Sequence, residues 1–233
     1  MPTAAELVQL PALDCAPQLL GAVITRHDDR LGDVSLRVTE VEAYHGKGMP
    51  GPVDACSHSR MGMTARNASM WGPPGHWYVY LNYGIHHALN LVCSPEGSAS
   101  GVLIRSAAVV SGLEAVRLRR GDSSTEVNLA RGPGNLAQAL GIASRELDGT
   151  PALGGARLTI ALDPEGPAGR GLSVLRGPRV GVNPEAEGAD YPWRFWLADE
   201  PSVSAYRAGG TPSSRRSRST GAAKKSRSSA VER

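Results

Sequence analysis

One aromatic stretch, HWYVYLNYGIHHALNLVC at residues 76–93, constrains the fold of this chain more than any other segment. It reads as two strands joined by a tight turn at Tyr83-Gly84, because aromatic and β-branched residues favour strands and glycine favours hairpin turns. Side chains alternate along a strand, so Tyr78 and Tyr80 are expected on one face. An ordinary hairpin packed on a core is the simplest interpretation. The stretch alone does not distinguish packing from function.

Length and composition leave several classes of protein open and exclude others. A chain of 233 residues with 41% apolar residues can bury a sizeable core in one large domain or two small ones. It contains no apolar run of about 18 residues, so no transmembrane helix and no membrane partner are expected. The N-terminus lacks a basic segment followed by an apolar block, which argues against secretion. Three cysteines without CxxC spacing favour a reducing cytoplasm.

Positive charge is concentrated at the C-terminus. Residues 209–233 contain seven Lys and Arg residues against one Glu, a net charge of +6, so the rest of the chain carries −3. A slightly acidic body needs a local basic face to bind nucleic acid. The tail is poor in apolar residues and is expected to be disordered. It either adds salt-sensitive affinity for phosphates or has no specific task. We expect one folded domain at residues 1–208 and a basic tail at 209–233.

The run VSLRVTEVEAY at residues 34–44 is a second strand candidate with an unusual pattern. On a regular strand, one face would carry two aliphatic residues, two acids and a tyrosine, namely Leu36, Val38, Glu40, Glu42 and Tyr44. Val41 and Ala43 would point to the other face. Two acids on such a strand lie at a solvated edge or face a polar cavity, and the edge is the more common case.

A loop-like segment follows at residues 45–74, rich in Gly, Pro and small residues, and a loop of this length is often functional or disordered. It contains Cys56 and His58. A metal site formed by these residues and the pair His86-His87 matches no common zinc spacing, so no metal is expected.

The remaining pattern is that of an α+β domain dominated by antiparallel pairing. Arg105 interrupts an aliphatic strand at residues 100–110, where an arginine is usually paired or snorkelling, with phosphate binding as the alternative. A short helix at 111–120 ends in a basic cluster, and Gly-Pro-Gly at 132–134 leads into a second helix whose N-terminus offers N–H groups to an anion. RLTIAL, PRVGV and WRFWLA complete the set as short strands.

Taken together, these pieces resemble one family, the alkyladenine (3-methyladenine) DNA glycosylases of the mammalian type. The matching segments, in the family's order, are Leu19-Leu20-Gly21, VEAY at 41–44, Ser57-His58-Ser59, TARN at 64–67, GPPGHWYVYLNYGIHHALN at 72–90, LIR at 103–105, RGPGNLAQALGI at 131–142, PRVGV at 178–182 and WRFW at 193–196. They cover nearly all of residues 19–206. The resemblance implies a single compact domain around a curved, mostly antiparallel sheet with a protruding hairpin.

The resemblance also implies an activity. Such a protein would be a monofunctional base-excision-repair hydrolase that flips alkylated or deaminated purines out of double-stranded DNA and cleaves their N-glycosidic bond. Its substrates would be 3-methyladenine, 7-methylguanine and hypoxanthine. It would need no metal and no organic cofactor, and it would act as a monomer. Its location would be the cytoplasm and nucleoid of a bacterium, or the nucleus of a eukaryote.

Individual residues match the family's functional positions. By this likeness Glu42 is the base that activates water, and Arg105 lies near that water and the backbone of the target nucleotide. The base pocket would be formed by Tyr44, His58, Tyr80 and Asn90. Tyr83 would be the wedge that fills the gap left in the duplex. Contacts to the DNA backbone are expected from Arg131, Gly132, Gly134, Arg117 and Arg120, whereas Asn135 stands where a lysine is common.

Two other classes compete with a glycosylase. A catalytically silent module could use the hairpin and the basic tail to bind distorted duplex, but it would not need Glu42 facing anionic DNA. A hydrolase of free nucleosides would not need Tyr83 as a wedge.

Overall fold

The computed structural model describes most of the chain, namely residues 3–82, 84–121, 124–162, 166–186 and 190–209. The expected wedge Tyr83 and the tail from residue 210 lie outside the described residues.

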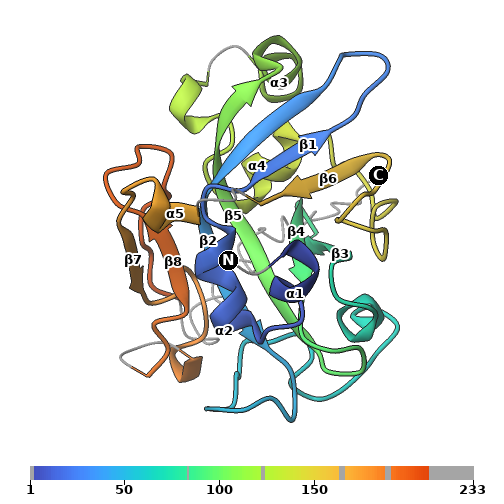
Figure 1. Ribbon diagram of the computed structural model, residues 1–233, viewed down its shortest axis with the longest axis vertical. Helices are drawn as coiled ribbons and strands as arrows, with labels where there is room; N and C mark the ends of the chain where they lie inside the picture. The colour runs from blue at the N-terminus through green and yellow to red at the C-terminus, as the bar shows by residue number, and fades with distance from the viewer. Residues whose placement is uncertain (1–2, 83, 122–123, 163–165, 187–189, 210–233) are drawn as a thin grey trace, which may run out of the picture.

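The described residues form one domain around a mostly antiparallel sheet (Figure 1), which confirms the expected α+β class. The strands are β1 Val23–Arg26, β2 Val34–His45, β3 Trp77–Asn82, β4 His86–Val92, β5 Ser100–Ser111, β6 Leu158–Ala161, β7 Val174–Gly177 and β8 Arg194–Leu197. The order β3-β4-β5-β2-β1-β6 makes the main path, and β8 pairs with both β2 and β7. Every pair of these strands is antiparallel.

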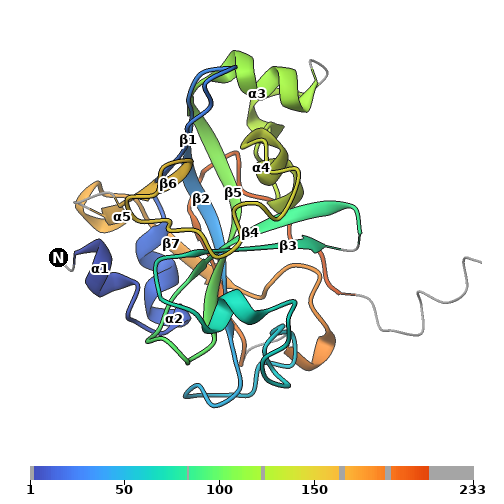
Figure 2. The same ribbon diagram turned by 90° about the vertical axis from the view of Figure 1, so that its right-hand side faces the viewer.

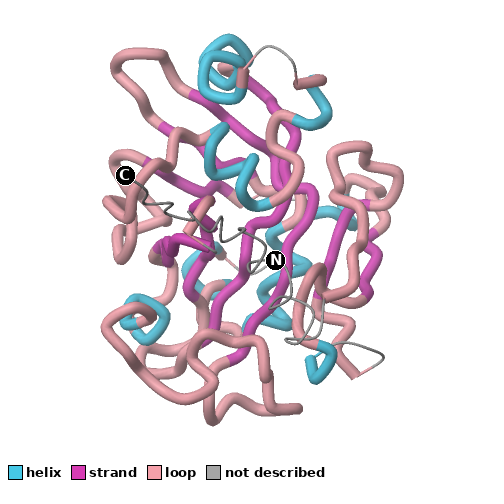
Figure 3. The backbone as a smooth tube through the Cα atoms, turned by 180° about the vertical axis from the view of Figure 1, so that it is seen from behind, coloured by secondary structure: helices cyan, strands magenta, loops and turns pink. Residues whose placement is uncertain are grey.

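Short helices surround the sheet, and long loops connect the elements (Figure 3). The α-helices are α1 Ala4–Leu7, α2 Ala12–Cys15, α3 Leu113–Arg120, α4 Pro133–Ala139 and α5 Gly166–Gly169, and the 3₁₀ helices are η1 Ala16–Leu19, η2 Ala68–Trp71, η3 Glu126–Asn128 and η4 Pro184–Ala186. The helices expected after residue 111 and after Gly-Pro-Gly are therefore α3 and α4. In the described part of the chain, no helix has the length and apolar character needed to cross a membrane.

The expected hairpin is confirmed as β3 and β4, which extend away from α1 and α2 in Figure 2. Its two faces differ. Trp77 and Val79 are fully buried in the main core, whereas Tyr78 packs in a second, smaller cluster with Met70 and Val92. The hairpin therefore contributes one face to the core and leaves the other for a site.

The outer edge of β3 is covered by a loop rather than by another strand. Asp148 accepts a hydrogen bond from the Val79 N–H at 3.0 Å, and the Arg145 guanidinium donates to the Val79 carbonyl at 3.1 Å. Arg145 and Asp148 also pair with each other. An exposed strand edge can pair with a strand of another molecule, and the contacts with Arg145 and Asp148 block such pairing along this part of β3.

The expectation of one regular face along residues 34–44 is wrong. Leu36 and Val38 lie in the main core, and so do Val41 and Ala43. The ladder between β2 and β5 shifts between Val38 and Glu40 and again between Glu40 and Val41, so each strand contains one extra residue there. Such paired bulges reverse the alternation of side chains on both strands. As a result the acids leave the aliphatic face.

The expectation of a solvated edge is also wrong. Glu40 and Glu42 are both 0% exposed, and β2 lies between β5 and β1 in the middle of the sheet. A third correction concerns PRVGV, which is a loop, while the strand β7 ends just before it at Gly177. Arg179 lies in that loop, and its buried side chain donates hydrogen bonds to the Ala43 carbonyl at the end of β2 and to Asp54. The segment therefore contributes a buried side chain near the site and forms no strand.

Candidate active site

A single row of the sheet places the central site residues side by side. Tyr78 of β3 pairs with Asn90 of β4, Asn90 pairs with Leu103 of β5, and Leu103 pairs with Glu42 of β2. Neighbouring strands are about 4.8 Å apart, so this row spans roughly 14 Å. Paired residues point to the same face of a sheet. The row therefore forms the floor of one site that four strands build together.

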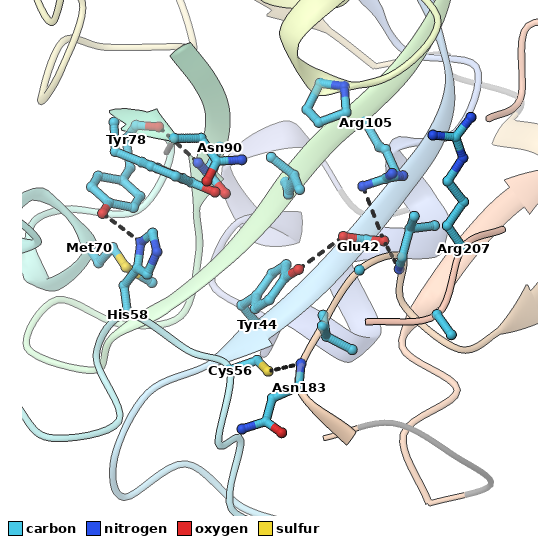
Figure 4. Close-up of a pocket in the computed structure, with 18 residues that line it drawn as sticks. Glu42, Tyr44, Cys56, His58, Met70, Tyr78, Asn90, Arg105, Asn183 and Arg207 are labelled. Carbon is cyan, nitrogen blue, oxygen red and sulfur yellow. Dashed lines mark hydrogen bonds and ion pairs between the residues drawn. The ribbon is translucent and has the colours of Figure 1, made fainter. Parts of the chain in front are cut away.

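A cavity of about 510 Å³ lies over this row, a size typical of small-molecule sites. Figure 4 shows its two ends: Tyr78, His58 and Met70 lie at one, and Glu42 and Arg105 lie at the other. The lining includes every described residue that was expected in catalysis or in the base pocket, namely Glu42, Arg105, Tyr44, His58, Tyr80 and Asn90.

Glu42 is buried and held on both oxygens. The backbone N–H of Val180 donates to Oε1 at 2.7 Å, and the Tyr44 hydroxyl donates to Oε2 at 2.9 Å. The Arg105 Nη1 lies 3.5 Å from Oε1. A buried carboxylate is costly unless such donors and a countercharge surround it. The site thus keeps an oriented carboxylate at the wall of a cavity.

Arg105 connects Glu42 to the second buried acid. Its Nε lies 3.1 Å from Glu40 Oε1, while its Nη1 faces Glu42. Glu40 also accepts hydrogen bonds from Arg194 at 2.6 Å and from the Ser106 hydroxyl at 2.6 Å. Glu40 does not line the cavity. It therefore acts as a structural anchor for the arginine, and Glu42 is the acid that meets the cavity.

Tyr44 is positioned by a buried ion pair that the sequence pattern did not reveal. The guanidinium of Arg179 lies 4.4 Å from the centre of the Tyr44 ring and makes two hydrogen bonds of 2.8 and 2.7 Å to Asp54. Both charged side chains are 0% exposed. Burial, followed by the nearby charge of Glu42, raises the pKa of Tyr44 well above its usual range, so its hydroxyl remains a donor.

The sequence indicated one member of this buried pair more clearly than the other. Arg179 belongs to the PRVGV segment already matched to the family, so its placement could have been suspected. Asp54 lies in the irregular loop before His58, where no periodicity indicates which side chain turns inward.

The opposite end of the cavity is aromatic. The Tyr78 and Tyr80 rings are stacked with centres 5.4 Å apart, and His58 meets Tyr80 edge-on at 4.4 Å. The His58 Nδ1 lies 3.0 Å from the Tyr78 hydroxyl. Burial raises the pKa of Tyr78 to about 12. Lost hydration, with the positive charges of Arg66 and Arg60, lowers the pKa of His58, which favours a neutral ring.

Asn90 lies in the floor between the two ends. The residue is 6% exposed, and its side-chain amide donates to the Tyr78 carbonyl at 3.1 Å. This bond across the hairpin fixes the direction of the amide.

The residues expected at the DNA backbone lie outside the cavity lining and make internal contacts. The N–H of Gly132 donates to the Ser106 hydroxyl at 2.9 Å, and a Cβ at Gly134 would lie 2.8 Å from the His86 ring. Between them, Pro133 lines the cavity. The Gly-Pro-Gly segment therefore packs α4 against the hairpin, and an anion-binding role for it stays a prediction.

The basic residues of this group are also engaged. Arg131 donates to the Val203 carbonyl at 2.8 Å, Arg120 to the Leu129 carbonyl at 2.9 Å, and Arg117 lies 4.0 Å from Glu126. Contacts of these arginines with DNA remain a prediction.

Cys56 and His58 share the cavity, but no group of three His, Cys, Asp or Glu residues suited to a metal occurs among the described residues. The Cys56 sulfur instead accepts the Asn183 N–H at 3.1 Å.

A cavity with stacked aromatic rings at one end and a buried carboxylate paired with arginine at the other has the features expected of an enzyme active site that accepts a planar ring. The sequence comparison then narrows this class. The family model described as methylpurine-DNA glycosylase (MPG) matches residues 6–201, and the chain belongs to this family.

Bacterial relatives carry the matching name "Putative 3-methyladenine DNA glycosylase". One from Streptomyces avermitilis is 46% identical over 217 residues, which cover 92% of this chain and 96% of the relative. One from Nocardia farcinica is 48% identical over 202 residues, covering 87% and 90%. One from Leifsonia xyli is 45% identical over 202 residues, covering 84% and 88%. The chain is thus a DNA glycosylase of DNA repair, and the family resemblance of the sequence is confirmed.

Proposed function

We propose that the cavity receives a damaged purine flipped out of duplex DNA, and that Glu42 activates the water that hydrolyses the N-glycosidic bond. The single observation that carries this proposal is the buried Glu42 carboxylate, fixed by Val180 and Tyr44 at the wall of a cavity with stacked tyrosines. A base inside the stack cannot be reached at its sugar, so extrusion must come first.

The chemical step uses groups already oriented. The oxygen of a water molecule adds to C1′ of the sugar, Glu42 takes a proton from that water, and the base leaves with the electrons of the C1′–N bond. The negative charge of Glu42 also stabilises the positive charge that develops on the sugar. Arg105 places a positive charge beside the Glu42 carboxylate, with Nη1 at 3.5 Å from Oε1. No step requires an amine of the protein, so the product is an abasic site without strand cleavage.

The aromatic end supports a preference for charged bases. 3-Methyladenine and 7-methylguanine are cationic, and a cation over an electron-rich ring gains about 1 kcal/mol per contact. Tyr80 at this end and Tyr44 beside Glu42 provide such rings, and the lowered pKa of His58 avoids a second positive charge beside the base. Asn90, fixed in the floor, would reject the 2-amino group of undamaged guanine. Hypoxanthine lacks that amino group and is therefore proposed as a further substrate.

The hairpin tip is proposed to enter the duplex. Ile85, next to the turn, is 71% exposed, so the tip presents an apolar side chain to solvent. Tyr83, the proposed wedge, belongs to this tip in the sequence. We further propose that the protein acts on double-stranded DNA as a monomer in the bacterial cytoplasm, since the relatives are bacterial.

A single-turnover assay tests the proposal on duplexes that contain 3-methyladenine, 7-methylguanine or hypoxanthine. Glu42→Gln keeps the shape of the side chain but removes its charge, and it should slow excision by at least about 100-fold, the scale of general-base catalysis. The matched control is Glu96→Gln, which makes the same chemical change at an exposed loop residue. DNA binding and thermal unfolding of both variants separate loss of chemistry from loss of fold.

The outcomes distinguish the alternatives. Excision by Glu42→Gln at the wild-type rate would show that another group activates water. Binding of damaged duplex without excision by the wild type would favour a silent binding module. Cleavage of free nucleosides in preference to duplex DNA would favour a nucleoside hydrolase.

A further inference from the structure

The last residues that the structure describes, 202–209, run from β2 to the lining of the cavity, and we call this segment the C-terminal strap. Its first portion is bound to β2. The Ser202 hydroxyl donates to the Thr39 hydroxyl at 2.9 Å, and the backbone N–H and hydroxyl of Ser204 donate to Glu40 at 2.8 and 2.9 Å. Glu40 thus holds two groups in place, the strap through Ser204 and the guanidinium of Arg105.

Two arginines hold the carbonyl groups of the strap. Arg131 donates to the Val203 carbonyl at 2.8 Å, and Arg194 donates to the Ser204 carbonyl at 2.6 Å. Each bond combines a charged donor with a backbone acceptor, a stronger class of hydrogen bond than a neutral pair. The path of the strap is therefore fixed up to Ser204.

The last portion of the strap is fixed to the loop after β7. The N–H of Gly181 donates to the Arg207 carbonyl at 2.8 Å. A Cβ at Gly209 would lie 1.5 Å from the Val182 carbonyl oxygen, so only glycine fits this approach. One contact is made by the backbone of Arg207 itself and the other lies two residues further on, so the backbone that carries the Arg207 side chain is restrained.

Arg207 itself lines the cavity at the end that holds Glu42 and Arg105, as Figure 4 shows. It is exposed, and within the described part of the chain no hydrogen bond or ion pair engages its guanidinium. Arg105 differs in this respect, because its guanidinium is committed to the two buried acids. Arg207 is therefore the cavity arginine with donors available to a ligand.

We propose that Arg207 binds a phosphate of the extruded nucleotide, an inference that rests on the proposed function of the cavity. With the base at the aromatic end and C1′ at Glu42, the sugar and its phosphates must lie toward the Glu42 end, where Arg207 stands. A guanidinium matches a phosphate with two parallel hydrogen bonds. Both buried carboxylates already have arginine partners, so Arg207 is not needed to neutralise them.

The inference assigns a phosphate role to a residue outside the group of five expected at the DNA backbone. It also gives the strap a purpose, since Glu40, Gly181 and Gly209 together determine where this cation lies.

The test compares wild type with Arg207→Gln in single-turnover excision of 7-methylguanine over a range of enzyme concentrations. The half-saturating concentration should rise about tenfold, the effect of removing one charge-assisted pair. The slope of log affinity against log salt concentration should become shallower by about 0.9, the value for one neutralised phosphate. Arg207→Lys should recover the salt slope but only part of the affinity. The matched control is Arg176→Gln, which removes an exposed arginine of β7 outside the cavity and should leave both quantities unchanged.

A neutral methylphosphonate in place of each phosphate that flanks the lesion locates the contact. At one position, the neutral linkage should lower the DNA affinity of wild type as much as Arg207→Gln does. The same linkage should lower the affinity of Arg207→Gln little further, because the paired charge is already absent. Independent, additive effects at every position would overturn the inference. An equal loss of affinity for undamaged duplex would also overturn it. If wild type leaves 7-methylguanine in place, the proposed function fails and this inference fails with it.

Discussion

The buried pair of Asp54 and Arg179 allows a prediction that separates folding from catalysis. Asp54 accepts four hydrogen bonds, two from Arg179 at 2.8 and 2.7 Å, one from the His45 N–H at 3.2 Å and one from the Cys56 N–H at 3.0 Å. Asp54→Asn removes the countercharge of a fully buried guanidinium and turns an amide donor toward other donors. Breaking a buried pair in this way costs about 3–5 kcal/mol of unfolding free energy.

The assay is urea unfolding of wild type and variant. The midpoint should fall at unchanged slope, and the melting temperature should drop by roughly 10 °C for a chain of this size. The matched control is Arg157→Gln, which removes one partner of the exposed Arg157–Glu146 pair, whose side chains are 54% and 44% exposed. That change should cost less than about 1 kcal/mol.

A double variant, Asp54→Leu with Arg179→Met, completes the test. Replacing both charges by apolar groups of similar size should restore part of the missing stability, because no unpaired charge remains buried, although the N–H groups of His45 and Cys56 lose their acceptor. Excision should stay slow, since the Tyr44 ring loses the cation that lies 4.4 Å from its centre. A destabilisation of less than about 1 kcal/mol in Asp54→Asn would refute this reasoning and would mean that water reaches Arg179.

Two further predictions concern charge. The pKa of His58 lies below its ordinary value of 6.5, so the ring should stay neutral, and excision of 7-methylguanine should persist, as the pH falls through that value. Arg66→Gln should move the acid limb of the pH–rate profile to higher pH, and an unchanged His58 titration by NMR would contradict the assigned cause. Truncation after Gly209 should weaken DNA binding mainly at low salt, with the salt slope reduced by about 0.9 for each phosphate that the tail neutralises. Loss of the chemical step at saturating enzyme would show that the tail is more than an accessory.

Local pattern was sufficient for much of the fold. The alternation of Trp77, Tyr78, Val79 and Tyr80 correctly divided the first hairpin strand into a core face and a site face, because that strand is regular. The short helix before Arg120 and the one after Gly-Pro-Gly were also found from their local signals.

The same rule failed along β2, and the reason is physical. Alternation assumes one residue for each step of the ladder, and the bulges at Glu40 break that assumption. A bulge is favoured by contacts with the neighbouring strand, here β5 with its Arg105, and no short-range pattern encodes it. The edge position expected for the acids therefore became a buried one in the middle of the sheet.

The site divides in a similar way. Glu42, Tyr80 and Asn90 were identified through segments that match the family, and the register places them over one cavity. Asp54 and Arg207 escaped because both lie in irregular backbone, where position depends on contacts 125 residues away or on a strap fixed by Glu40. The positions of Asp54 and Arg207 in the site are determined by contacts with residues far away in the sequence, and not by local sequence preference.

The bulges in β2 and β5 make the position of Glu42 depend on chain length as much as on residue type. Deleting Thr39 would restore an unbroken pleat in which residues 36, 38, 41 and 43 still share the aliphatic face, so Glu42 would keep its side of the sheet. Inserting one residue between Val41 and Glu42 would instead turn residues 42 and 44 toward the aliphatic core. A substitution at Thr39 leaves the number of residues unchanged and keeps the carboxylate in the cavity. Between the bulge and Tyr44, this strand should accordingly tolerate exchange of side chains far better than the insertion or deletion of a single residue.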